Sequence, residues 1–146
     1  MIRTATLKDI PELLIIESKS FNPSHRFSRN QFSYAIINNN NYFRIYEESG
    51  FLKGYVYVLS TGRIYSIAAY PSNDGIGSIL LERAEDFVCT ILNKDTIKLE
   101  VKKGNNKAIN FYTKHGYKPY GIKHNYYKDG KSAILMRKDL NQNAKG

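Results

Sequence analysis

Several residue types that define large protein classes are scarce in this chain of 146 residues. It contains one cysteine, Cys89, and no tryptophan. A single cysteine excludes an internal disulfide and leaves no cysteine pair for a structural zinc site. Cys89 lies in a helical apolar pattern, which favours buried packing over a role as a nucleophile. The three histidines, His25, His115 and His124, show no metal-ligand spacing, so we expect no metal site.

Long apolar runs are missing as well. No segment approaches the ~20 apolar residues that a membrane-spanning helix needs, and the first residues lack the apolar core of a signal peptide. We therefore expect a cytoplasmic protein with no membrane partner. Because 42% of the residues are hydrophobic and no low-complexity block occurs, residues 1–140 are expected to form one folded domain. Residues 141–146 are expected to form a disordered tail.

Acidic residues are rare in the last third of the chain. Between Lys98 and Lys138 there are eleven Lys or Arg residues and two acids, Glu100 and Asp129, whereas the rest of the chain has eleven of each sign. The formal net charge of +9 therefore arises in this third. A local basic field attracts anions such as nucleotide phosphates, an acidic peptide or RNA. A basic face kept only for solubility gives the same composition, so charge alone does not identify a partner.

The sequence itself alternates between helical and strand patterns. One helix is expected over 6–21, capped by Thr6 and Asp9, and a second follows a capping box at Ser28 and Gln31. Further helical patterns cover 79–91 and 108–114, and strand patterns rich in aromatic and β-branched residues cover 42–47, 54–60, 63–69, 96–101, 117–127 and 133–138. The strand over 96–101 follows a helix and is expected to run parallel to 63–69. Lys128-Asp129-Gly130-Lys131 is expected to form a hairpin turn between the last two strands.

Two glycines, in Gly75-Ile76-Gly77, separate the strand over 63–69 from the helix behind it. The first turn of a helix has backbone N–H groups without internal partners and the positive end of the helix dipole, so it can bind a phosphate that no side chain blocks. Glycine removes that obstruction. Taken alone, this pair is more often simple turn punctuation, and the choice depends on the residues downstream.

Three segments of the chain resemble the GCN5-related N-acetyltransferase (GNAT) superfamily. Ile67-Ala68-Ala69 through Gly75-Ile76-Gly77 resembles its acetyl-CoA pyrophosphate loop. Leu99-Glu100-Val101, followed by Asn105 to Tyr117, is similar to the signature N-x-x-A-x-x-x-Y-x-x-x-G-F with Tyr in the last place. Asn125-Tyr126-Tyr127 precedes the final strand. Together with Glu17, Phe21, Phe27 and Ser28, these segments resemble the ribosomal-protein-alanine N-acetyltransferase (RimI-like) branch, which acetylates protein N-termini.

The resemblance implies a fold and an activity. The fold is α/β (α+β), with a central mixed, mostly antiparallel sheet of six to seven strands flanked by about four helices. The activity is direct transfer of acetyl from acetyl-CoA to an amine, foremost the N-terminal α-amine of a protein or peptide. A small-molecule amine, a lysine side chain and a non-catalytic acyl-CoA-binding module are the alternatives. Nucleic acid is not an expected partner, and the protein is expected to be a monomer or a homodimer.

The resemblance also assigns the residues that bind acetyl-CoA. They are Ile67, Ala68, Ala69, Asp74, Gly75, Ile76, Gly77, Ser78, Asn105 and Tyr112. The loop departs from the family pattern in one respect, because the Gln or Arg that usually stands three residues before the first glycine is Ser72 here. Asp74 adds a negative charge beside the expected phosphate. Backbone N–H groups can still bind the pyrophosphate, and the departure bears on affinity for acetyl-CoA.

Two residues are the candidates for proton transfer. Glu100 stands where the RimI-like branch has its proposed general base, and an α-amine of pKa near ~7.7 to 8.0 needs only modest help from a base. Pairing of Glu100 with Lys98 or Lys102 on a solvated face is the alternative interpretation. Tyr112, the signature tyrosine, is expected to protonate the departing thiolate, since a phenol of pKa near ~10 stays protonated at neutral pH. Packing on Phe111 and Tyr117 is the alternative for Tyr112.

The acceptor is expected to enter between two loops. By resemblance Phe21 and Phe27, in the segment after the first helix, and Tyr126 and Tyr127, before the last strand, flank its entry. Cross-strand packing explains such a tyrosine pair equally well. Asn105 is expected to cap the short helix and to touch the pantetheine region at the same time.

Overall fold

Seven strands form one mixed sheet in the order β1-β2-β3-β4-β5-β7-β6. The computed structural model describes residues 1–72 and 74–140, so the tail expected over 141–146 lies outside the described residues. The strands are β1 Ile2–Thr4, β2 Tyr42–Glu48, β3 Phe51–Val58, β4 Arg63–Ala69, β5 Thr96–Lys102, β6 Lys118–Lys123 and β7 Ala133–Asp139. Neighbouring strands are antiparallel except β4 and β5, which are parallel. The expected mixed, mostly antiparallel sheet is confirmed.

Four α-helices pack on this sheet, namely α1 Ile10–Ser20, α2 Arg29–Ile37, α3 Ile76–Asp86 and α4 Asn106–Lys114. Short 3₁₀ turns, η1 Leu7–Asp9 and η2 Pro23–His25, precede α1 and α2, and α3 continues into a π-helical turn, η3 Phe87–Ile91. Both predicted capping boxes are confirmed. The Asp9 carboxylate accepts from the Thr6 backbone N–H at 2.7 Å, and Ser28 and Gln31 exchange hydrogen bonds of 2.7 and 3.2 Å. These bonds satisfy N–H groups that the helix starts leave unpaired.

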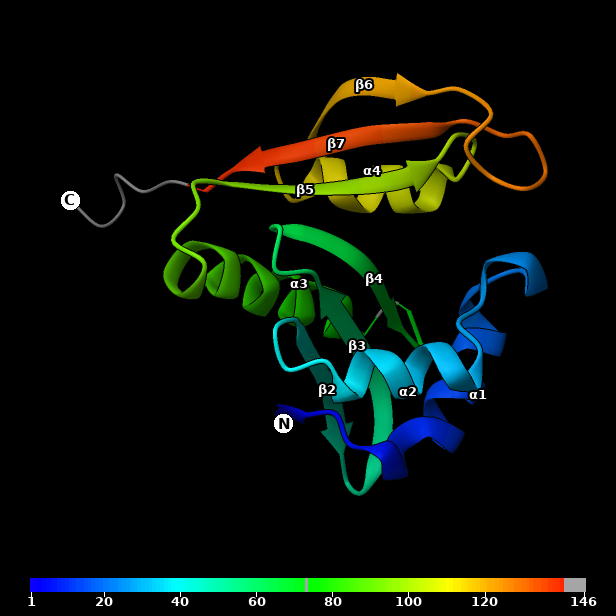
Figure 1. The fold of residues 1–146 in the computed structure, drawn as a ribbon, viewed down its shortest axis with the longest axis vertical. Helices are drawn as coiled ribbons and strands as arrows, with labels where there is room; N and C mark the ends of the chain where they lie inside the picture. The colour runs from blue at the N-terminus through cyan, green and yellow to red at the C-terminus, as the bar shows by residue number, and fades with distance from the viewer. Residues whose placement is uncertain (73, 141–146) are drawn as a thin grey trace.

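The helices cover the sheet unequally on its two faces. Figure 1 shows α1 and α2 in front of β2 to β4, with α3 behind these strands and α4 behind β5 and β7. The face of β5, β7 and β6 on the side of α1 and α2 is not covered by a helix. Strand β3 joins two hydrophobic clusters because its side chains alternate between the faces. Val56 and Val58 pack with α3 and α4, whereas Tyr55 and Tyr57 pack with α1 and α2.

Some predicted boundaries are wrong. The strand expected over 117–127 ends at Lys123, and residues 124–132 form a wider loop in place of a tight hairpin turn. Asn125 has a left-handed φ of 52°, and the backbone N–H groups of Tyr126 and Tyr127 both donate to the Lys131 carbonyl. The pattern over 79–91 starts too late, since α3 begins at Ile76 directly after the glycine turn. Strand β1 was too short to give a periodic signal.

Strands β4 and β5 diverge after a short contact. They pair only at Arg63 with Lys98 and at Ile64 with Leu99. Beyond these pairs, the backbone of β4 from 65 to 69 has β3 on one side and no strand partner on the β5 side. A gap therefore opens in the middle of the sheet, between its two halves, and exposes backbone N–H and C=O groups that a bound chain can use.

Candidate functional site

A cavity of about 310 Å³ lies where β4 and β5 diverge. The end of α1, the last residues of β4, the first turn of α3 and the helix α4 surround it. It is lined by Lys19, Ser20, Phe21, Ile67, Ala68, Ala69, Tyr70, Ser72, Gly77, Asn105, Lys107, Ala108, Phe111 and Tyr112. Seven predicted site residues thus meet in one place: Phe21, Ile67, Ala68, Ala69, Gly77, Asn105 and Tyr112. They come from four elements that are far apart in the sequence.

The N-terminus of α3 opens onto this region without a side-chain cap. Gly75 occupies the N-cap position with a left-handed φ of 80°, and among the described residues no side chain caps the helix. A Cβ atom added at Gly75 would meet nothing within 4 Å. Glycine is therefore needed at this position for its backbone conformation, and it leaves the first N–H groups of α3 accessible. An 11-residue helix presents its positive dipole end here.

Other predicted residues of the glycine loop have separate roles. The Ile76 side chain is buried in the core below the helix start. The Ser78 hydroxyl lies 3.0 Å from His115 Nε2 on α4 and ties the two helices together. Asp74 is exposed. Ile76 and Ser78 thus hold the start of α3 in place, whereas the Asp74 side chain and the backbone groups of the turn face solvent.

Lys107 supplies a cation beside the glycine loop, which the sequence pattern did not reveal. Its Nζ donates to the Ser72 hydroxyl at 2.8 Å, and both residues line the cavity. Ser72 stands where the family pattern has Gln or Arg, and Lys107 brings a positive charge to this position from the first turn of α4. Lys19 at the end of α1 also lines the cavity. The signal for Lys107 was its place two residues after Asn105, but its contact with Ser72 depends on the tertiary fold.

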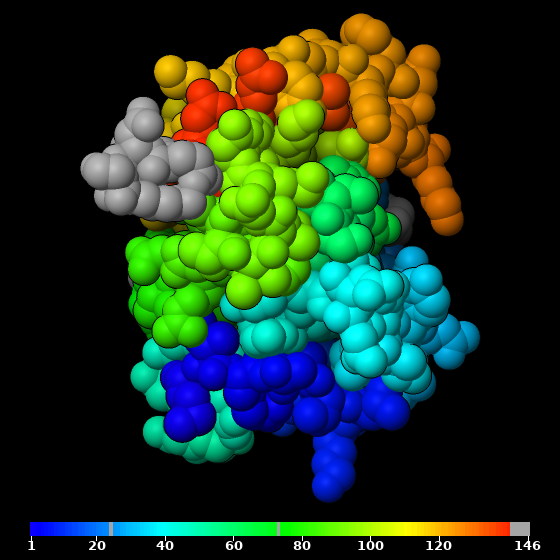
Figure 2. Space-filling view, turned by 60° about the vertical axis from the view of Figure 1, so that its left-hand side comes forward, coloured from blue at the N-terminus to red at the C-terminus, as the bar shows by residue number. Residues whose placement is uncertain are grey.

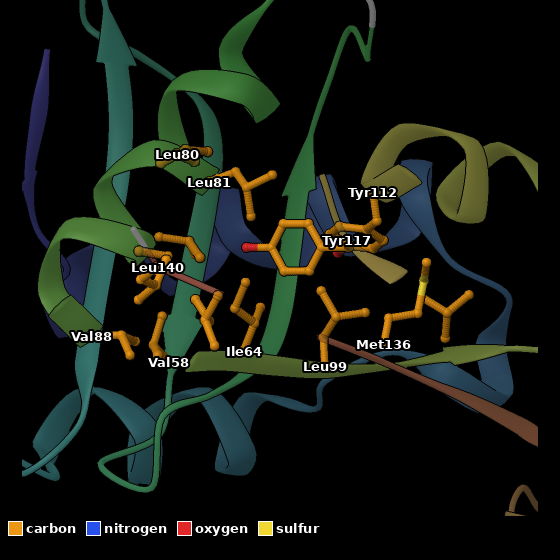
Figure 3. Close-up of a cluster of buried hydrophobic side chains, with 14 of the residues drawn as sticks. Val58, Ile64, Leu80, Leu81, Val88, Leu99, Tyr112, Tyr117, Met136 and Leu140 are labelled. Atoms are coloured by element: carbon orange, nitrogen blue, oxygen red, sulfur yellow. The ribbon is translucent and has the colours of Figure 1, made fainter. Parts of the chain in front are cut away.

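Tyr112 projects from α4 between the cavity and the core. Its side chain is buried with Tyr117, Leu99 and Met136 (Figure 3), and it also lines the cavity. Burial raises the pKa of Tyr112, so the phenol remains protonated at neutral pH. Tyr112 packs on Phe111 and Tyr117 at centroid distances of 5.3 and 5.6 Å and also lines the cavity, so its packing is compatible with the expected role as proton donor.

Glu100 is the first residue of β5 beyond the last pair with β4, on the uncovered face of the sheet. It forms salt bridges of 2.9 Å with both Arg63 and Lys123. The alternative pairing with Lys98 or Lys102 is therefore wrong. Burial acts to raise the pKa of Glu100, but hydrogen bonds from Tyr126 and Lys123 and the charge of Arg63 outweigh it and lower the pKa. Glu100 does not line the 310 Å³ cavity. Its side chain projects from the face of β5 that is opposite to α4.

The predicted acceptor residues fall into different places. Tyr126 lies beside Glu100, and the ring of Tyr127 packs on His25 of the α1–α2 connection with centroids 5.2 Å apart. Phe27 instead packs on Phe32 at 5.0 Å and lines a separate cavity of about 490 Å³. The structure thus does not join Phe27 to Phe21 in one site. The loops that carry Tyr127 and His25 do meet over the sheet.

Glu17 fixes the loop that contains Phe27. The carboxylate is buried, accepts the Phe27 backbone N–H at 2.7 Å and accepts a hydrogen bond from the Tyr55 hydroxyl. Burial raises the pKa of Glu17 more than these bonds lower it. The Tyr55 hydroxyl also lies 2.7 Å from the Ser66 hydroxyl on β4. Glu17 therefore positions the α1–α2 connection relative to β4.

Asn105 caps α4, as expected, and lines the cavity. Its Oδ1 accepts the Ala108 backbone N–H at 3.3 Å and so caps α4. The same residue lines the cavity. Gly116 follows α4 with a left-handed φ of 94° and ends the helix as expected.

Comparison with known proteins identifies the family. A model of the acetyltransferase (GNAT) domain matches residues 11–140. The chain belongs to the GNAT acetyltransferase family. GNAT enzymes transfer acetyl to amines and in general use acetyl-CoA as the donor, and this GNAT chain has their fold. No helix in residues 1–72 and 74–140 is long and apolar enough to cross a membrane, and no three His, Cys, Asp or Glu side chains in that part form a metal-binding group.

Three relatives illustrate the similarity. A Bacillus subtilis protein provisionally named ribosomal protein bS18-alanine N-acetyltransferase is 30% identical over 148 residues, which cover 97% of this GNAT chain and 96% of that protein. An N-alpha-acetyltransferase of Sulfurisphaera tokodaii is 35% identical over 85 residues, covering 57% of this chain and 51% of that protein. The crystal structure of the ribosomal-protein-S18-alanine N-acetyltransferase from Escherichia coli superposes with a TM-score of 0.77 at 24% identity, covering 96% and 93% of the two chains.

Proposed function

We propose that this GNAT protein is a cytoplasmic, acetyl-CoA-dependent N-acetyltransferase of protein or peptide N-terminal α-amines. The observation that carries the proposal is the gap between β4 and β5, which has Tyr112 on one side and Glu100 at its mouth on the other. The two relatives named for alanine and α-amine acetylation support the choice of acceptor. Direct attack needs both reactants bound at once, and a gap open to both faces of the sheet allows that.

The cavity residues fit acetyl-CoA. The uncapped N-terminus of α3 offers backbone donors for a pyrophosphate, and Lys107 and Lys19 add positive charge near it. The free backbone edge of β4 from 65 to 69 can hold the pantetheine arm as an additional strand. When bound, acetyl-CoA supplies an acetyl thioester. Tyr112 lines the cavity and stays protonated because burial raises its pKa, so its hydroxyl could donate a proton to the departing thiolate.

The lowered pKa of Glu100 favours an α-amine as acceptor. A carboxylate held by two cations is a weak base. An α-amine of pKa ~7.7 to 8.0 is partly neutral at cellular pH, whereas a lysine amine of pKa ~10.4 is almost fully protonated and needs a stronger base. Glu100 Oε1 or Oε2 can accept the proton that an α-amine releases on attack. Lysine side chains and polyamines are therefore the second choice of acceptor.

The test is acetyl transfer to a panel of acceptors. The purified protein is mixed with acetyl-CoA and with N-terminal peptides, internal-lysine peptides blocked at the N-terminus, or small amines, and free thiol is measured. We expect transfer to the N-terminal peptides. Transfer only to lysine or small amines would assign the second acceptor class. Binding of acetyl-CoA without transfer to any acceptor would contradict an enzymatic role and indicate an acyl-CoA-binding module.

Lys107 offers a sharper test of the acetyl-CoA site. Removal of its charge in Lys107→Ala should weaken acetyl-CoA binding about five- to tenfold, as expected for a lost contact between a cation and a phosphate. Lys114→Ala is the matched control, because Lys114 is exposed at the other end of α4 and does not line the cavity. Titration calorimetry measures both affinities. Equal affinities of the two variants would show that Lys107 does not replace the basic residue missing at Ser72.

A further inference from the structure

Four basic side chains form a row across the uncovered face of the sheet. Arg63 pairs with Lys98 across β4 and β5, Lys98 with Arg137 across β5 and β7, and Arg137 with Lys118 across β7 and β6. Cross-strand partners project from the same face, so these four residues, which we call the cation row, lie side by side. With about 4.8 Å between strands, the row spans roughly 14 Å.

The cation row is poorly neutralised by the protein itself. Like charges directly opposite each other destabilise a sheet, so the row lowers the stability of the free protein and an anion bound to it would restore that loss. Within residues 1–72 and 74–140, Arg63 pairs with Glu100, but Lys98, Arg137 and Lys118 have no salt bridge. Lys98, Arg137 and Lys118 are all exposed.

A groove of about 500 Å³ lies beside the row and is separate from the acetyl-CoA cavity. It is lined by Thr61, Gly62, Arg63, Lys94, Asp95, Thr96, Lys98 and Arg137. In Figure 2 the yellow-green segment around 94–102 lies exposed next to the green segment around 60–64. Asp95 is the one acid in this lining, and its carboxylate accepts the Thr96 hydroxyl at 3.3 Å. Cations therefore outnumber acids four to one along the groove.

The cation row adjoins the place where the acceptor amine reacts. Lys98 lies two residues before Glu100 on β5, about 6.6 to 6.8 Å along the strand and on the same face. Arg63 belongs to the row and also bonds Glu100. An extended peptide advances about 3.3 to 3.6 Å per residue. A peptide whose amine lies at Glu100 and whose chain runs along β5 towards Lys98 would reach the row at about its third residue, and the next two residues would lie over the row.

The aromatic side chains on this face favour a peptide over RNA. Tyr120 has Lys98 and Arg137 over its ring at 5.8 and 5.1 Å from the centroid, and Tyr126 has Lys123 at 5.1 Å. RNA-binding sheets stack bases on open aromatic faces. Here the charged groups of Lys98, Arg137 and Lys123 already lie over these rings, which leaves the ring faces less open to a base, while the exposed side of each cation can still meet a carboxylate.

We propose that the cation row binds acidic side chains at about the third to fifth residue of the acceptor, so that this enzyme selects acidic N-terminal segments. This inference rests on the proposed function and names the substrate class within it. The carboxylates neutralise Lys98, Arg137 and Lys118, which removes the repulsion within the row. Charge complementarity of this kind acts on binding and leaves the chemical step unchanged.

The test compares three peptides that share their first two residues and carry Asp, Ser or Lys at positions three to five. The Asp peptide should have a KM lower than the Lys peptide by on the order of tenfold, with similar kcat. Arg137→Glu should reverse this order. Lys8→Glu makes the same change of charge on exposed Lys8, on η1, and should preserve it. Equal KM values for the three peptides, or equal effects of the two variants, would overturn the proposal.

Binding without reaction separates this inference from the proposed function. N-acetylated, fluorescently labelled versions of the same peptides cannot accept acetyl, and their anisotropy reports binding alone. Binding of the acetylated Asp peptide that Arg137→Glu abolishes supports the row, even if no free peptide is acetylated and the proposed function fails. If the Asp, Ser and Lys peptides are acetylated equally well, the proposed function stands and the proposed role of the cation row is refuted. Tight binding of a short single-stranded RNA, lost in Arg137→Glu while all peptides bind equally, assigns the face to RNA instead.

Discussion

Tyr112 of α4 and Glu100 of β5 lie on opposite faces of the sheet, on either side of the gap between β4 and β5. Tyr112 reaches the gap from the side of α4, and Glu100 stands at the first position of β5 past its last pair with β4. Their environments shift their pKa values in opposite directions, since burial raises that of Tyr112 while cations lower that of Glu100. One group is therefore kept protonated and the other deprotonated at neutral pH, which suits an acid and a base.

Replacement of Tyr112 by Phe should lower kcat on the order of 100-fold, because it removes the proton donor for the thiolate and little else. Affinity for acetyl-CoA should change little. Tyr117→Phe is the matched control, since Tyr117 lies in the same cluster (Figure 3) but its hydroxyl donates to Glu85 at 2.8 Å. Single-turnover rates and calorimetry give the two quantities. If both variants turn over equally fast, Tyr112 has only a packing role.

Replacement of Glu100 by Gln should lower the rate most at low pH. Below the acceptor pKa of ~7.7 to 8.0 the amine is protonated and needs a base, and above it the free amine attacks unaided. Because the pKa of Glu100 is lowered, its carboxylate stays ionised across this whole range in the wild type. We expect a loss of roughly tenfold or more at pH about 6.5 that shrinks towards pH about 9.

The control for Glu100→Gln must remove a cation that pairs with Glu100 while the carboxylate of Glu100 stays in place. Lys123→Gln does so, because Lys123 is the exposed partner of Glu100. It should retain the wild-type pH profile. A loss in Glu100→Gln that is the same at every pH would assign Glu100 a structural role between Arg63 and Lys123.

At the scale of elements, local signals in the sequence predicted more than nonlocal ones. The capping boxes at Thr6 and Ser28 and the glycine that ends α4 involve residues within four positions of each other, and all three are confirmed. The end of β6 was mispredicted because Tyr126 and Tyr127 follow a loop whose bonds to Lys131 override their strand preference. The alternation of apolar residues does not show whether the strand preference or the hydrogen bonds of the loop prevail.

The glycine turn before α3 can be tested at this scale with Gly75→Val. A β-branched side chain at a left-handed φ is strained and also covers the first N–H groups of α3. Acetyl-CoA binding should become undetectable. Gly50→Val imposes similar strain, because Gly50 has a φ of 83° and open space around it in the turn between β2 and β3. Calorimetry measures the affinity of both variants for acetyl-CoA. Gly50→Val shows the effect of backbone strain alone, and equal affinities of the two variants would contradict a phosphate site at the N-terminus of α3.

At the scale of the whole molecule, the sequence predicted the fold but only part of the site. Asn105 and Tyr112 of the signature line the same cavity, because one helix, α4, carries both. The contact of Lys107 with Ser72 joins residues 35 positions apart. The cation row joins four strands, so its register exists only once the sheet is assembled. Phe27 was expected at the acceptor entry by resemblance, and its ring lies 5.4 Å from that of Tyr65 on β4, in a cavity separate from the one that Phe21 lines.

The division of the sheet raises the question of whether its halves unfold together. The β4–β5 contact is short, which weakens the backbone connection between the two halves. The hydrophobic cluster behind the sheet bridges them, however, because Leu80 and Leu81 of α3 belong to the same cluster as Val58 of β3 and as Leu99 and Met136 beyond the gap (Figure 3). Packing of α3 therefore couples the halves, and we expect one cooperative unfolding transition.

Leu80→Ala tests this coupling, since Leu80 has no exposed surface. It should lower the free energy of unfolding by about 2 to 5 kcal/mol, the usual range for a buried leucine. Ile79→Ala is the control on the same helix, because Ile79 is 41% exposed, and it should cost less than about 1 kcal/mol. Urea titrations followed by circular dichroism and tyrosine fluorescence, the chain having no tryptophan, measure both variants. Coincident curves with an unchanged m value are expected for Leu80→Ala; a second transition would show that the halves separate when α3 is loosened.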